Sequence, residues 1–259
     1  MSTAAVLAST AAFVVVYMLV FWTTSLARRD ASIVDIGWGL GFVGIAVVSC
    51  ALSPGWDGRR WLLTGMTALW GLRLAGYLFW RNHGQPEDYR YQAMRRKYGE
   101  RFGLVSLVTV FALQGVLMWI VSLPVQIGQL SQEPAQITAL DLAGVLVWAA
   151  GLLFETVGDL QLARFKADPA NRGQVMDRGL WRYTRHPNYF GDACAWWGLY
   201  LVALATGAWW TALGPALMTF LLMRVSGVPM LERNMAKRRP AYTDYVERTN
   251  AFFPGRPRG

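Results

Sequence analysis

Four polar side chains stand where a long apolar run of the chain begins: Arg185, His186, Asn188 and Asp192. The intervening Pro187 suits the first turn of a helix, because it lacks an N–H group and its φ is fixed. Free backbone N–H groups at such a helix start favour a phosphate or another anion, with Arg185 and His186 beside it. Asn188 and Asp192 lie one turn apart and can bind amide or hydroxyl groups. The segment predicts a site for a polar ligand; helix capping with interfacial anchoring by neighbouring aromatic residues is the alternative.

Four more charged side chains fall inside apolar runs: Asp35, Arg73, Glu155 and Asp159. A charge at membrane depth costs about 2.5–3.5 kcal/mol even on the mild insertion scale, so each is a candidate functional residue. In an apolar pocket, the Asp35 carboxyl group could donate a proton or a hydrogen bond near neutral pH. Its glycine-rich surroundings permit close approach of a backbone or a ligand. A structural ion pair with Arg73 is the alternative interpretation, and the two can coexist.

Glu155 and Asp159 are spaced i, i+4, which places both on one face of a helix. Arg164 and Lys166 follow within two turns. This pattern fits a lattice of salt bridges and a ligand site about equally well. The polar loop 168–178 leads directly back to the Arg185 segment, which favours the ligand site.

Composition indicates that these residues lie in an integral membrane protein. The chain has 259 residues, 54% of them hydrophobic and 16% charged, with 13 Trp. Runs near the roughly 20 residues needed to cross a bilayer predict an all-α fold with seven transmembrane helices, cytoplasmic loops and an amphipathic C-terminal tail. The runs cover residues 4–26, 33–52, 61–80, 104–127, 139–160, 189–206 and 208–228. We expect the first run to be retained as a membrane anchor, since it lacks the features of a cleaved signal peptide.

Most Lys and Arg residues fall on one side of this topology, which places the N-terminus outside and the C-terminus in the cytoplasm. The net charge of +9 therefore describes a cytoplasmic face, not a nucleic-acid-binding surface. Part of this charge contacts anionic lipid headgroups, and binding of an anionic ligand is the alternative. Two Cys and two His residues predict neither a disulfide framework nor a metal site. No repeat or linker divides residues 1–259, so we expect one domain, and no obligate protein partner is indicated.

The segment from Gly179-Leu180 through Arg185-His186-Pro187-Asn188-Tyr189 to Asp192 resembles the membrane-embedded steroid 5α-reductase family, including its bacterial members. The resemblance is strongest over residues 155–254 and includes Leu113-Gln114-Gly115. It implies a seven-helix enzyme of the bacterial inner membrane that takes NADPH from the cytoplasm and a hydrophobic steroid-like enone from the lipid. Because no G-x-G-x-x-G follows a predicted strand, a Rossmann site is not expected.

The resemblance also implies roles for individual residues. The positions that match cofactor contacts, together with basic or aromatic neighbours, are Asp159, Arg164, Lys166, Tyr183, Arg185, His186, Asn188, Asp192 and Arg224. Arg90, in the loop 87–91, is a candidate donor to the 2′-phosphate. Asp35 matches the carboxylate that polarises the substrate carbonyl, although the family's animal enzymes have Glu there. Trp70 stands where the family has a tyrosine, so the proton donor stays open among Trp38, Arg73 and Tyr77. The basic tail 232–245 either lies on the membrane or covers the cofactor pocket.

The leading hypothesis is therefore NADPH-dependent reduction of the C=C bond of an α,β-unsaturated ketone, such as a Δ4-3-ketosteroid giving a 5α-reduced 3-ketosteroid. An Arg-His-Pro-x-Tyr pattern also occurs in membrane isoprenylcysteine methyltransferases, so an S-adenosylmethionine-dependent methyltransferase is one alternative. A small lipid-binding or transport bundle is the second alternative, weakened because we see no inverted repeat.

Overall fold

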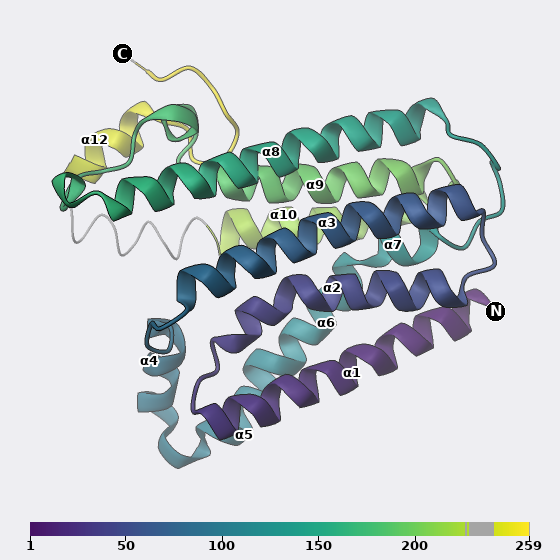
Figure 1. The fold of residues 1–259 in the computed structure, drawn as a ribbon, viewed down its shortest axis with the longest axis horizontal. Helices are drawn as coiled ribbons and strands as arrows, with labels where there is room; N and C mark the ends of the chain where they lie inside the picture. Colours follow the sequence, from purple (N-terminus) through teal and green to yellow (C-terminus); the bar gives the residue numbers. More distant parts are fainter. Residues whose placement is uncertain (226, 228–240, 259) are drawn as a thin grey trace. The chain divides into compact units, whose positions relative to one another are not determined.

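The computed structural model describes residues 1–225, 227 and 241–258, and these residues are helical without any strand (Figure 1). The α-helices are α1 (Thr3–Arg28), α2 (Ile33–Leu52), α3 (Asp57–Asn82), α4 (Tyr89–Tyr98), α5 (Phe102–Ser106), α6 (Leu113–Val121), α7 (Leu123–Gly128), α8 (Ala139–Ala167), α9 (Pro187–Leu204), α10 (Leu213–Phe220) and α12 (Ala241–Arg248). Short 3-10 helices cover Gly99–Arg101, Pro169–Asn171, Gly179–Arg182 and Trp209–Ala212, and π-helices cover Leu107–Ala112 and Leu221–Val225.

Five helical segments of the described chain are long and apolar enough to cross a membrane. They are α1, α2, α3, the continuous stretch Tyr89–Val121, and α8. An all-α fold with five candidate membrane spans is thus confirmed for the described residues, whereas the count of seven spans is not. The two remaining apolar runs form α9, which has polar side chains in its first turns, and α10, which is flanked by 3-10 and π-helical turns. The tail 232–245 lies outside the described residues except for its last five positions, which belong to α12.

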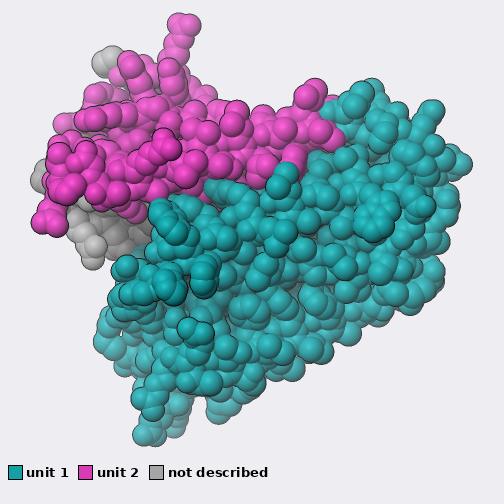
Figure 2. All heavy atoms as spheres, viewed as in Figure 1, with its two compact units in different colours: residues 1–142, 201–214 teal, residues 143–200, 215–259 magenta. Residues whose placement is uncertain are grey.

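The chain divides into two compact units, coloured separately in Figure 2. Unit 1 contains residues 1–142 and 201–214, and unit 2 contains residues 143–200 and 215–259. Asp35 belongs to unit 1, whereas Asp159 and Asn188 belong to unit 2. The two groups of candidate residues therefore belong to different units.

In unit 1, α2 packs along α3 with backbone against backbone (Figure 1). A Cβ atom added to Gly39 would lie 2.4 Å from the carbonyl oxygen of Gly71, and one added to Gly71 would lie 2.6 Å from the carbonyl oxygen of Gly39. Small residues at such a contact allow two helix backbones to approach closely. Gly39 thus serves helix packing, which is one of the two uses that the sequence left open for the glycines after Asp35.

A buried ion pair in unit 1 joins the first turn of α3 to the first turn of α8. Arg59, in the first turn of α3, donates from Nε to Asp141 Oδ1 at 3.1 Å and from Nη2 to Asp141 Oδ2 at 3.2 Å, and both side chains are fully buried. Arg59 also donates to the carbonyl oxygens of Pro134 and Gln136. Thr138 donates to Asp141 through its N–H and its hydroxyl. The two side chains therefore fix the loop before α8 to the start of α3.

In unit 2, α8 and α9 run side by side through four glycines (Figure 1). Gly151 and Gly158 of α8 are seven residues apart, as are Gly191 and Gly198 of α9. A Cβ atom at Gly191 would lie 2.5 Å from the backbone nitrogen of Glu155 and 2.5 Å from the carbonyl oxygen of Gly151. The close contact sets the register that places Asn188 beside Asp159.

Candidate functional site

The candidate site of unit 1 is centred on the Asp35 carboxylate, in the first turn of α2. Arg90 Nη2 donates to Oδ2 at 2.6 Å, and the Tyr91 hydroxyl donates to Oδ1 at 2.8 Å. Gln114 Nε2 lies 3.4 Å from the Tyr91 oxygen, to which it donates. Asp35 and Arg90 are partly buried and Tyr91 is buried. A carboxylate, a guanidinium, a phenol and an amide thus form one chain of hydrogen bonds.

The partner of Asp35 differs from the one considered in the sequence. The alternative interpretation paired Asp35 with Arg73. In the structure, Asp35 forms an ion pair with Arg90 and accepts a hydrogen bond from Tyr91. The residues 87–91 are not simply a loop, because Asp88 caps the N-terminus of α4 by accepting from the Arg90 N–H at 2.9 Å. This helix turns Arg90 and Tyr91 back toward α2.

The other three candidate catalytic residues lie apart from this hydrogen-bonded chain. Trp38 is half-buried and packs edge-on against Phe42, with ring centroids 5.1 Å apart. Arg73 lies over the ring of Tyr77 at 5.5 Å. Tyr77 also faces the Arg81 guanidinium at 5.8 Å. Tyr91, which the sequence reasoning had not considered as a catalytic residue, is the phenol that contacts Asp35. The N-cap Asp88 followed by helix-forming residues up to Gly99 was the signal that could have located it.

Arg90 was a candidate donor to a 2′-phosphate. In the structure, its guanidinium forms ion pairs with two carboxylates of the protein. Besides Asp35, it donates from Nε to Asp88 at 2.8 Å. Burial alone raises the pKa of Asp88, but the hydrogen bonds from Arg90 outweigh burial and hold that pKa below its ordinary value. The guanidinium therefore lies between two carboxylates, and its first role is to orient Asp35.

The candidate site of unit 2 lies where α8 meets the first turns of α9. Asn188 Nδ2 donates to Asp159 Oδ1 at 3.1 Å, and Asp159 is buried. Glu155, one turn before Asp159, is buried too, and its backbone is the one that Gly191 contacts. Asp192 follows Gly191 on α9 and is partly buried. The structure therefore brings Asp159, Asn188, Glu155 and Asp192 to one helix contact. The i, i+4 spacing had predicted only that the two members of each pair share a helix face.

The basic and aromatic candidates around this contact have different exposures. Arg164, Lys166, Tyr183 and Arg224 are exposed, whereas Arg185 and His186 are buried. Arg185 Nη1 donates to the carbonyl oxygens of Val246 and Thr249 at the end of α12, and its N–H donates to the carbonyl oxygen of Asn250 at 2.9 Å. A guanidinium at a helix C-terminus is favoured by the helix dipole.

The segment 179–186 is thus held from two directions. Trp181 Nε1 donates to the Gly158 carbonyl oxygen on α8 at 3.0 Å, and the Leu180 N–H donates to Gln161 at 3.0 Å. On the C-terminal side, the Thr184 hydroxyl donates to the Phe252 carbonyl oxygen at 2.8 Å. His186 stacks on Tyr189, with ring centroids 5.3 Å apart. The C-terminal segment therefore packs on the Arg-His-Pro-Asn motif.

Helix packing makes Gly191 a sensitive position. We expect Gly191→Ala to lower the free energy of unfolding by about 1–3 kcal/mol, because its methyl group would meet two backbone atoms. Gly76→Ala on α3 is the matched control: no atom lies within 4 Å of its Cβ position, and alanine is the better helix former. Thermal unfolding of both variants in detergent checks this expectation. A Gly191→Ala variant as stable as Gly76→Ala would contradict the close α8–α9 contact.

Comparison with known proteins gives a family for the chain. The family described as a protein of unknown function (DUF1295) matches residues 21–249, and the chain belongs to it. The chain is also similar to an uncharacterized protein of Schizosaccharomyces pombe, at 22% identity over 263 residues that cover 91% of this chain and 76% of that protein. No solved structure matches the chain. The family match includes both candidate sites.

Proposed function

We propose that the protein is an NADPH-dependent reductase of the steroid 5α-reductase type, which saturates the C=C bond of a hydrophobic α,β-unsaturated ketone. The observation that carries the proposal is the hydrogen-bonded chain Asp35, Tyr91 and Gln114 at the end of an apolar helix bundle. Such a chain holds a phenol O–H in a partly buried place, where a hydrogen bond to a developing negative charge is stronger than in water. The substrate class we propose is a Δ4-3-ketosteroid or a similarly flat enone.

In this reaction the protein must stabilise charge on the carbonyl oxygen of the substrate. Tyr91 and Arg90 are the donors that we propose for this oxygen, and Asp35 orients both of them. Gln114 donates to the Tyr91 oxygen. The phenol has one proton, which it donates to Asp35 in the structure, and in our proposal this proton turns to the carbonyl oxygen when the substrate binds. When the enolate has formed, Tyr91 gives its proton to the α-carbon and regains one from solvent. Tyr91 thus takes the place for which Trp38, Arg73 and Tyr77 were the candidates.

The residues at the α8–α9 contact fit the cofactor that the family resemblance implies. Asn188 and Asp159 provide an amide and a carboxylate, which suit the hydroxyl and carboxamide groups of a dinucleotide. Arg164, Lys166 and Arg224 are exposed, and we propose that they bind the phosphate groups of the cofactor. Asp192 and Tyr183 complete the proposed set, whereas Arg185 and His186 support it from within the fold. When bound, NADPH would supply the hydride that is added to the β-carbon of the enone.

The same proposal includes the topology. Seven spans, with α9 and the segment around α10 as the last two, would place the N-terminus outside and the C-terminus in the cytoplasm of a bacterial inner membrane. The distribution of charge supports this orientation, because Lys and Arg gather on the predicted inner side. A reporter fused to each end, active only in the periplasm or only in the cytoplasm, tests the orientation.

Activity is tested with the purified protein in detergent, mixed with NADPH and a Δ4-3-ketosteroid while the absorbance of the reduced nicotinamide is followed. We expect consumption of NADPH that depends on the enone. A thermal-shift comparison of NADPH with adenosylhomocysteine separates the reductase from a methyltransferase, because each class is stabilised by its own ligand. Stabilisation by adenosylhomocysteine alone, or no effect of NADPH with any of several enones, would refute the proposal.

Asn188 gives the sharpest test of the cofactor site. We expect Asn188→Ala to weaken NADPH binding about tenfold, since it removes an amide that contacts Asp159 and, in our proposal, the cofactor. Asn250→Ala is the control, because its side chain contacts only the C-terminal segment in the described residues. The dissociation constants are measured by titration of nicotinamide fluorescence. Unchanged NADPH affinity in Asn188→Ala would remove this residue from the site.

A further inference from the structure

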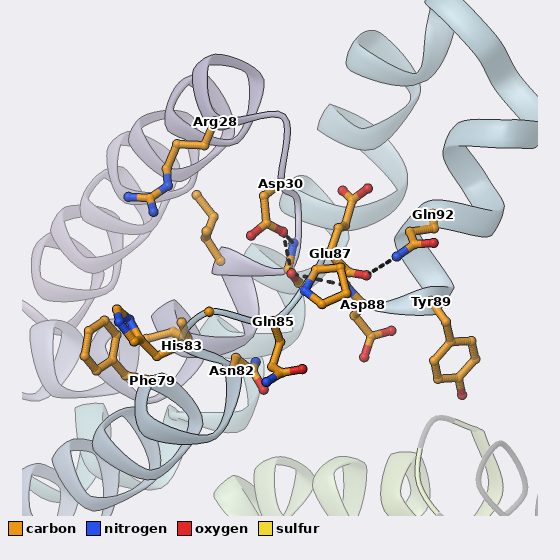
Figure 3. Close-up of a pocket in the computed structure, with 15 residues that line it drawn as sticks. Arg28, Asp30, Phe79, Asn82, His83, Gln85, Glu87, Asp88, Tyr89 and Gln92 are labelled. Atoms are coloured by element: carbon orange, nitrogen blue, oxygen red, sulfur yellow. Dashed lines mark hydrogen bonds between the residues drawn. The ribbon is translucent and has the colours of Figure 1, made fainter.

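Unit 1 contains a polar cavity that the proposed reaction does not use (Figure 3). Its volume is about 430 Å³, within the range of small-molecule sites. Its walls are the last turn of α1, the connection to α2, the end of α3 and the residues 83–89. Figure 3 shows Arg28 on one side, Asp30 above the centre, and His83 beside Phe79.

Two of the acidic groups in the wall already have cationic partners. Glu87 accepts from Arg95 Nη2 at 2.8 Å, and Asp88 accepts from Arg90 Nε at 2.8 Å. Burial alone raises the pKa of Glu87, but the hydrogen bonds from Arg95 and from the Ala31 N–H lower it below its ordinary value. Both carboxylates are therefore charged near neutral pH and compensated within the protein.

Arg28 and Asp30 differ from this pattern. Asp30 accepts from the N–H and the hydroxyl of Ser32 and interacts with the Arg95 guanidinium only at longer range. Neither Asp30 nor Arg28 has a group of opposite charge within 4.0 Å among the described residues. The cavity thus offers one guanidinium and one carboxylate, separated by a single residue. This pair of opposite charges is complementary to a ligand that itself carries both a cation and an anion.

The remaining wall is apolar and belongs to membrane helices. Ile33 and Ile36 lie in the first turn of α2, and Phe79, on the last turn of α3, is 56% exposed. Both helices are long and apolar enough to cross a bilayer. Helix ends rich in Arg lie at the level of lipid headgroups. The cavity therefore suits a ligand that has a charged headgroup and an apolar body better than it suits a fully polar metabolite. A phospholipid is such a ligand.

We propose that the cavity binds the headgroup of a phospholipid that carries phosphoethanolamine. Arg28 binds the phosphate, with the nearby Gln85 and His83 as further donors, and Asp30 accepts from the primary ammonium group. The first carbons of the acyl chains, next to the glycerol group, lie against Ile33, Ile36 and Phe79. A phosphoglycerol headgroup has no cation for Asp30, and the quaternary ammonium of phosphocholine has no N–H to donate.

The test uses the purified full chain in detergent and short-chain lipids below their micelle concentration. Dihexanoyl phosphatidylethanolamine, its phosphatidylcholine and phosphatidylglycerol counterparts, and free O-phosphoethanolamine are compared by native mass spectrometry. We expect the ethanolamine lipid to bind at least tenfold more tightly than the other three compounds. Equal binding of phosphatidylglycerol would overturn the assignment of the ammonium to Asp30. Equal binding of free O-phosphoethanolamine would overturn the choice of a lipid.

Two variants locate the site. Arg28→Gln removes the guanidinium and keeps a polar side chain, and Asp30→Asn removes the charge and keeps an oxygen that accepts from Ser32. Each variant is expected to weaken binding of the ethanolamine lipid about tenfold. Arg29→Gln is the matched control, because Arg29 is the next residue, is exposed, and does not line the cavity. Equal affinities in Arg28→Gln and Arg29→Gln would overturn the proposal. NADPH binding stays unchanged in all three variants, so failure here is distinct from failure of the proposed reductase function.

Discussion

Replacing Tyr91 with Phe is expected to lower the turnover number with an enone by about 10²–10⁴-fold, the usual contribution of a positioned proton donor. The substitution removes only the hydroxyl that donates to Asp35 at 2.8 Å and accepts from Gln114. Asp35→Asn is expected to lose turnover to a similar extent, because a neutral amide no longer holds Arg90 and Tyr91 in place. The dissociation constant of NADPH stays the same in both variants, since the proposed cofactor residues belong to unit 2.

Two other tyrosines supply matched controls for this prediction. The Tyr17 hydroxyl of α1 donates to the Gly37 carbonyl oxygen at 2.7 Å, so Tyr17→Phe removes a comparable hydrogen bond without touching Asp35. Tyr77→Phe tests the earlier candidate on α3, whose ring contacts Arg73 and Arg81. Turnover is measured together with thermal stability for each variant. Full turnover in Tyr91→Phe, or a loss confined to Tyr77→Phe, would show that the proton donor has been misassigned.

The sequence was sufficient to locate the long apolar helices, because an apolar run must satisfy its backbone internally when it is in a membrane. The predicted run 33–52 coincides with α2, and the run 4–26 lies within α1. Hydropathy could not show that the run 104–127 contains a π-helix from Leu107 to Ala112 and a break at Ser122. Such changes depend on which neighbour each turn packs against, and a one-dimensional pattern does not contain that information.

The two candidate sites were predictable to different degrees for a physical reason. Asn188 and Asp159 lie on two apolar helices whose i, i+4 patterns fix the polar face, so their proximity followed once the helices were expected to pack. The partner of Asp35 could not be predicted from the sequence, because it comes from α4, a short polar helix that hydropathy treats as a loop. Arg185 was expected to favour a ligand, which stays a prediction. Its contact with α12 did not follow from the sequence, which does not show which carbonyl groups a buried guanidinium will meet.

Arg59→Met is expected to lower the free energy of unfolding by about 3–5 kcal/mol, because it leaves the fully buried Asp141 carboxylate without its charged partner. The loss also frees the carbonyl oxygens of Pro134 and Gln136, which accept from the guanidinium. Unfolding in mixed micelles, followed by tryptophan fluorescence, measures the change. Lysine at this position restores only part of the stability, since an ammonium cannot make the bidentate contact.

The pair can be separated from its surroundings by a double-mutant cycle. Arg59→Met together with Asp141→Leu should cost less than the sum of the two single variants, because no uncompensated charge is left in the interior. Asp57→Asn is the control: its pair with Arg60 is 2.6 Å long, but its side chain is 77% exposed, so we expect a change below about 1 kcal/mol. Additive losses in the cycle would mean that Arg59 acts through its backbone contacts with the loop, and that the Asp141 carboxylate is stabilised mainly by Thr138.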